Sequence, residues 1–106
     1  MDLIRQVFGD PALMDAEELE YAYGLIHTAT VLSGGAKETL LKLRNKGPIW
    51  DGDVPSKSGR DELLDCDAAA KVVVRGEQGY QACTYKGWDL AKVVDAIGRS
   101  SEVKSS

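Results

Sequence analysis

Apolar residues recur at helical spacing over the first third of the chain. Residues 3–8 have the spacing of one or two turns of an amphipathic helix, and Gly9 ends it. A second helix is expected to run to about Leu32, because apolar residues recur there at three- and four-residue steps. Its start is open between two signals. Asp10 is followed by a proline suited to the first helical position, while Asp15 has an acidic residue three positions later, as in a variant capping box.

The middle of the chain predicts two shorter helices with an extended piece between them. Ser33-Gly34-Gly35 is expected to be a flexible break, and a helix then covers residues 36–46, where Gly47 and a following proline stop it. The next two residues, both large and apolar, favour a short extended stretch with a turn after it. Ser58, with an aspartate three residues later, predicts the cap of a helix that ends near Cys66.

The last third of the chain predicts a hairpin and a closing helix. Residues 71–75 are rich in valine and are expected to form a strand. A loop over residues 76–79, with glycine at both ends, leads to the returning strand at residues 80–84. The last helix is expected to end at Gly98, and the polar residues 99–106 predict a disordered tail.

Composition narrows the class of protein. The 106 residues are the length of one domain, and no apolar run approaches a membrane span or a signal peptide. The two cysteines are therefore expected to stay reduced in a cytoplasmic protein. A single histidine argues against a structural zinc or a hydrolase triad, and no phosphate-binding glycine motif is present. We expect a protein that is not an enzyme and needs no cofactor.

Charge is unevenly distributed along the chain. The formal net charge is −4. Residues 1–33 carry six acids and one base, which gives −5, and the rest of the chain sums to +1. Nucleic-acid-binding proteins usually carry a cluster of basic residues on their surface. In this chain such a cluster can form only locally, after residue 33.

From residue 36 the predicted order is helix, short extended piece, turn, helix, hairpin, helix, which is the order of a winged helix-turn-helix. Two segments, RDELLDCDAAAKVVV and GYQACTYKGWDLAKVV, resemble winged-helix regulators of the multiple-antibiotic-resistance type. The resemblance covers about the last two-thirds of the chain. The segment GPIWDGDVPSKSGRDELL is similar to small uncharacterised proteins of Mu-like bacteriophages. Residues 56–66 occupy the position of the recognition helix in those regulators. The chain departs from the regulators at Asp67-Ala68, where they have Gly-Leu, and in the acidity of this recognition helix.

The resemblance implies an α+β fold with three parts: N-terminal helices over residues 1–35, a winged helix over residues 36–98, and the tail over residues 99–106. In this resemblance the predicted hairpin is the wing and residues 76–79 are its tip. The resemblance also implies a set of DNA-binding residues at the start of the recognition helix, beside the wing and at the wing tip. These residues are Ser56, Lys57, Ser58, Arg60, Lys71, Arg75 and Gln78. Each also has a plain structural explanation, as a helix cap, a solvated charge or a strand-end charge.

The function expected from this resemblance is that of a small DNA-binding transcription regulator, in the setting of a temperate phage, with double-stranded DNA as partner. The alternative is a winged helix that binds a protein and no DNA, which the net negative charge favours. The N-terminal helix ending near Leu32 either packs on the rest of the chain or pairs with its copy in a homodimer. Both tryptophans, Trp50 and Trp88, are expected in or at the edge of the core.

Overall fold

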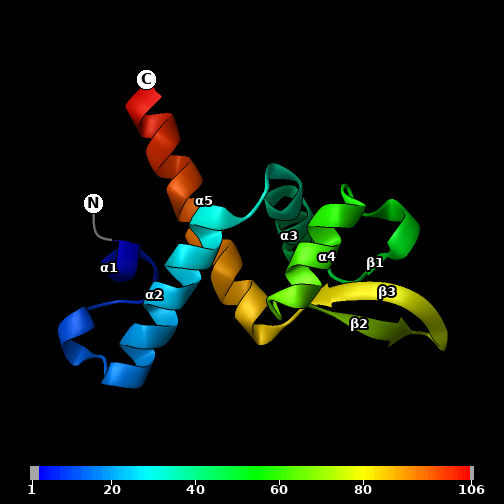
Figure 1. The fold of residues 1–106 in the computed structure, drawn as a ribbon, viewed down its shortest axis with the longest axis horizontal. Coiled ribbons are helices and arrows are strands. Elements are labelled where there is room, and N and C mark those ends of the chain that lie inside the picture. The colour runs from blue at the N-terminus through cyan, green and yellow to red at the C-terminus, as the bar shows by residue number, and fades with distance from the viewer. Residues whose placement is uncertain (1–2, 106) are drawn as a thin grey trace.

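The fold is α+β in a computed structural model that describes the backbone of residues 3–105 and the side chains of residues 3–98 (Figure 1). In chain order the elements are α1 (Leu3–Val7), the 3-10 helix η1 (Pro11–Leu13), α2 (Ala16–Val31), α3 (Gly34–Lys46), β1 (Ile49–Trp50), the 3-10 helix η2 (Asp51–Asp53), α4 (Lys57–Asp65), β2 (Ala69–Val74), β3 (Glu77–Cys83) and α5 (Tyr85–Ser105). None of the helices in this described part is both long and apolar enough to cross a membrane.

The three strands form one antiparallel sheet in the order β1-β3-β2. The hairpin β2–β3 turns at Arg75 and Gly76, with φ of 52° and 79°, because this left-handed pair matches the twist of the strands. The predicted loop over residues 76–79 is therefore wrong. Gln78 lies in β3, in an irregularity of the register where Gly79 has φ 94°, and not at the hairpin tip.

Both helix-start signals near the N-terminus are used. Asp10 caps η1 and Asp15 caps α2, where its side chain accepts a hydrogen bond of 2.8 Å from the Glu18 amide. Ser33 caps α3 by accepting from the Ala36 amide at 3.1 Å, so α3 begins at Gly34. The flexible break predicted over residues 33–35 is therefore wrong, because the serine hydroxyl satisfies a free amide of the first turn.

The start of α4 differs from the prediction by two residues. Ser56, and not Ser58, is the cap, and its hydroxyl accepts from the Gly59 amide at 2.9 Å. The helix ends at Asp65, and Asp67 has a left-handed backbone conformation with φ 63°, which aspartate tolerates better than most residues.

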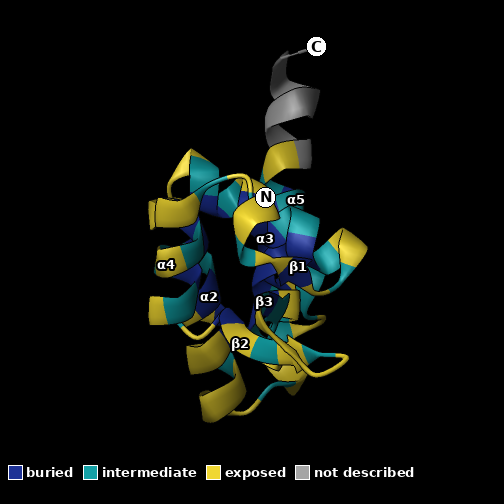
Figure 2. Cartoon of the chain, turned by 90° about the vertical axis from the view of Figure 1, so that its right-hand side faces the viewer, coloured by how far each residue is buried: buried dark blue, intermediate teal, exposed yellow. Residues whose placement is uncertain are grey.

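The core lies between α2, α3, α5 and the sheet, with α4 against α3 (Figure 2). Its largest fully buried apolar side chains are Leu25, Leu40, Leu43, Leu63, Leu90 and Val93. The apolar face of α2 packs on α5, where the Tyr21 hydroxyl also donates to Asp89 at 2.8 Å. The N-terminal helices therefore pack within the chain, the first of the two alternatives.

The closing helix is longer than predicted. α5 continues through Gly98 to Ser105, because Gly98 does not take the positive φ that ends many helices. The stop predicted at Gly98 is wrong, and the tail predicted to be disordered is helical up to Ser105. Ser106 lies outside the described residues.

Candidate nucleic-acid interface

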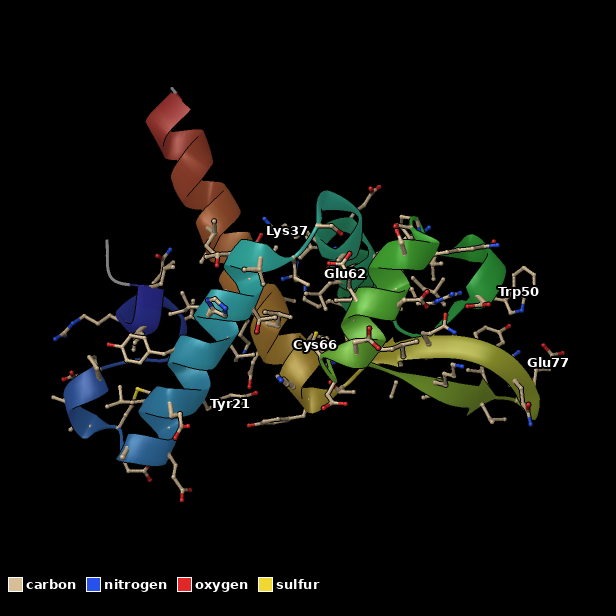
Figure 3. The ribbon with its side chains drawn as sticks, in the orientation of Figure 1. Tyr21, Lys37, Trp50, Glu62, Cys66 and Glu77 are labelled. Atoms are coloured by element: carbon tan, nitrogen blue, oxygen red, sulfur yellow. The ribbon has the colours of Figure 1, made fainter. Side chains whose placement is uncertain are left out.

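The position of α4 is fixed by its close approach to α3. A Cβ atom on Gly59 would lie 2.6 Å from both the Gly35 carbonyl carbon and the Ala36 amide nitrogen. Beside this contact, the Ser33 amide and hydroxyl both donate to the Glu62 carboxylate, the amide at 3.1 Å. These bonds lower the pKa of Glu62. Glu62 is therefore part of the joint between the helices, and its charge is held away from the outer face of α4 (Figure 3).

Arg60 is held by two carboxylates of the chain itself. Its Nη1 pairs with Asp51 of η2, and its Nη2 pairs with Asp61 at 3.0 Å. The hydrogen bonds to Asp61 and Asp51 raise the pKa of Arg60. Only 16% of the Arg60 side chain is exposed. The DNA contact predicted for Arg60 would have to replace these ion pairs, whereas its present contacts join η2 to α4.

A groove of about 280 Å³ runs between α4 and the hairpin. It brings together three of the seven residues predicted from the sequence, Arg60, Lys71 and Gln78. The other lining residues are Asp51, Asp61, Leu64, Gly79 and Gln81. Gln81 is buried, and its side-chain oxygen has no hydrogen-bond partner among the described residues. Because Arg60 faces two carboxylates here, the groove as a whole is not a strongly basic surface.

The remaining predicted residues do not line this groove. Lys57 is the first residue of α4, and Arg75 is at the hairpin turn. The Ser58 hydroxyl lies 3.3 Å from that of the capping Ser56. Lys57, Lys71 and Arg75 are exposed and make no ion pair or hydrogen bond through their side chains within the described part of the chain. Three cations are therefore available to an external anion.

Trp50 belongs to this end of the molecule and is exposed, so its predicted position in or at the edge of the core is wrong. It is 50% exposed and lies at the same end of the molecule as Glu77, the first residue of β3 (Figure 3). The alternation of side chains along a strand could have identified it. Ile49 faces the core, so its neighbour Trp50 must point the other way. Trp88, on α5, is 49% exposed, so its predicted position in or at the edge of the core is also wrong.

The described residues contain no group of three or more histidine, cysteine or acidic side chains arranged to hold a metal ion. The two cysteines, Cys66 and Cys83, are free thiols and partly buried. Burial raises the pKa of the Cys83 thiol to about 11. Comparison of the chain with protein-family models, curated proteins and solved structures finds no match.

Proposed function

We propose that the chain is a winged helix-turn-helix protein that binds double-stranded DNA. The proposal rests first on the order of elements from α3 to α5. In it, α3 is the first helix of the motif, η2 is a shortened second helix, α4 is the recognition helix and β2–β3 is the wing. The antiparallel order β1-β3-β2, with the two-residue strand β1 at one edge, agrees with this assignment.

The single observation that carries DNA binding is that α4 and the hairpin present three exposed cations without a partner in the described chain: Lys57 on α4, and Lys71 and Arg75 on the hairpin. Two of the acids on α4 are occupied, since Asp61 pairs with Arg60 and Glu62 bonds to Ser33. The acidic residues of α4, which in the sequence argue against DNA binding, are thus partly neutralised by contacts within the chain. Phosphate groups at the first turn of α4 would also meet its positive dipole end.

In this proposal Lys57, Lys71 and Arg75 contact phosphates, Ser58 and Gln78 are the polar residues within reach of the duplex, and Ser56 caps the helix. Arg60 is a positioning residue that ties η2 to α4. A small transcription regulator is the role we infer for such a module. The likeness of residues 47–64 to proteins of Mu-like phages is the reason to place it in a temperate phage.

A protein-binding module is the second candidate function, and one observation favours it. Three aromatic side chains are exposed where α2 meets the start of α5: Tyr21, Tyr85 and Trp88 at 38%, 83% and 49%. Exposed aromatic side chains are enriched at protein interfaces. None of these three side chains lines the groove between α4 and the hairpin, so a protein partner or a second copy there is compatible with DNA binding.

Retardation of labelled duplex fragments at low salt tests the DNA proposal. Lys57→Ala and Arg75→Ala should each weaken binding by about 1 kcal/mol, roughly fivefold, because each removes one charge-assisted contact to phosphate. Lys92→Ala, which removes an equally charged side chain from α5, is the matched control and should leave binding unchanged. Absence of retardation at micromolar protein and low ionic strength would contradict DNA binding and favour the protein partner.

A further inference from the structure

A second concave site lies at the edge strand, formed by aromatic and basic side chains. Trp50 and Tyr80 are direct partners in the register of β1 and β3. With Lys42, Lys46, Pro48 and Asp53 they line a pocket of about 370 Å³. Pockets of this size hold small ligands or parts of larger ones.

The indole ring of Trp50 is held in place by two glycines. A Cβ atom on Gly52 would lie 2.0 Å from Cζ3 of the ring, and a Cβ atom on Gly79 would lie 3.4 Å from its Nε1. The ring therefore packs directly on the backbone of η2 and beside β3, yet half of the residue remains exposed. Its N–H has no acceptor among the described residues. Trp50 is thus an aromatic surface with little freedom to move, which is what a stacking partner requires.

The charges of the pocket favour an anion. Lys42 and Lys46 are four residues apart on α3 and so lie on one face of that helix. Lys42 is positioned by donating to the Asp53 backbone oxygen at 3.2 Å, and Lys46 is exposed. Asp53 is the one acid among the pocket residues, so the two ammonium groups leave a net positive charge.

We propose that this pocket binds one nucleotide of a single-stranded nucleic acid. The base stacks on the exposed part of Trp50, and the phosphate lies between Lys42 and Lys46. Stacking on an aromatic side chain beside a basic track is the usual way in which single strands are bound. A base paired within a duplex cannot present its face to Trp50, so the occupant is an unpaired strand. This site uses none of the three cations assigned to duplex DNA and does not depend on that proposal.

Tryptophan fluorescence tests the site, because the chain has two tryptophans of nearly equal exposure. Trp88→Phe leaves Trp50 as the reporter, and Trp50→Phe leaves Trp88 as the matched control. A ten-residue oligothymidylate should quench Trp50 saturably and leave Trp88 unchanged. Adding Lys46→Ala to the Trp88→Phe variant should lower the affinity for the oligothymidylate roughly tenfold, because the substitution removes an exposed charge of the pocket and leaves the core unchanged.

Equal quenching of both tryptophans would overturn the proposal, as would an unchanged affinity after Lys46→Ala. Thymidine monophosphate is the probe for a free nucleotide and should bind much more weakly than the oligomer. Equal affinity for the two would contradict a nucleic-acid strand as the occupant. Retardation of duplex by the Lys46→Ala variant is measured in parallel. Duplex binding that persists while oligomer binding is lost separates this site from α4 and the hairpin.

Discussion

Replacing Gly87 with alanine is expected to destabilise the protein by roughly 3 kcal/mol, at the upper end of the cost of overpacking. The added Cβ would lie 1.9 Å from the Ala68 carbonyl oxygen, a backbone atom that cannot rotate away. That oxygen also accepts the Thr84 amide at 3.1 Å, and the Thr84 hydroxyl caps α5 by accepting from the Gly87 amide at 3.0 Å. Relief of the clash therefore requires α5 to move away from α4 and the hairpin.

Gly98→Ala is the matched control, because it lies on the same helix with nothing within 4 Å of the added Cβ. It should stabilise the protein by about 1 kcal/mol through helix propensity alone. Urea unfolding followed by far-ultraviolet circular dichroism gives both values. If the two variants shifted the unfolding midpoint in the same direction, the close contact between α5 and Ala68 would be wrong.

Gly59→Ala is expected to cost about 2 kcal/mol and to weaken duplex binding. The new methyl group would meet the backbone of Gly35 and Ala36 at 2.6 Å, so α4 must move away from α3. The same movement would strain the bonds between Ser33 and Glu62. Both effects follow from one displacement, since Lys57 is carried on α4.

Gly34→Ala provides the comparison for this variant, because it is also helical and has open space around its Cβ. It should be neutral or slightly stabilising, and its duplex binding should equal that of the natural sequence. Loss of stability in Gly59→Ala with full retention of duplex binding would show that the placement of α4 on α3 has no role in that activity.

Local signals in the sequence predicted most of the elements, because helices and hairpins are largely specified by neighbouring residues. The stop at Gly47 is correctly predicted, and Asp15, one of the two start signals left open for the second helix, caps α2. Two of the errors arose where two local signals competed. Ser56 and Ser58 are both suitable caps for α4, and Ser56 is the one used. Gly76 and Gly79 favour a four-residue hairpin loop between them, whereas the chain turns at Arg75 and Gly76.

The candidate site was less predictable, because its properties depend on contacts between distant segments. Arg60 looks like a free cation in the sequence, but the fold places Asp51 of η2 against it. Glu62 is removed from the outer face of α4 by Ser33, 29 residues earlier in the chain. The groove between α4 and the hairpin and the pocket beside Trp50 likewise result from packing between elements. The spacing of apolar residues along the chain does not predict such packing.

The dependence of duplex binding on salt concentration tests the central proposal most directly. Three available cations, Lys57, Lys71 and Arg75, predict a slope of log K against log salt of about −2.7 for one protomer. Lys57→Ala with Arg75→Ala should reduce that slope to about −0.9, and Lys92→Ala should leave it unchanged. A slope near zero, or one that the double substitution does not alter, would contradict duplex binding through α4 and the hairpin.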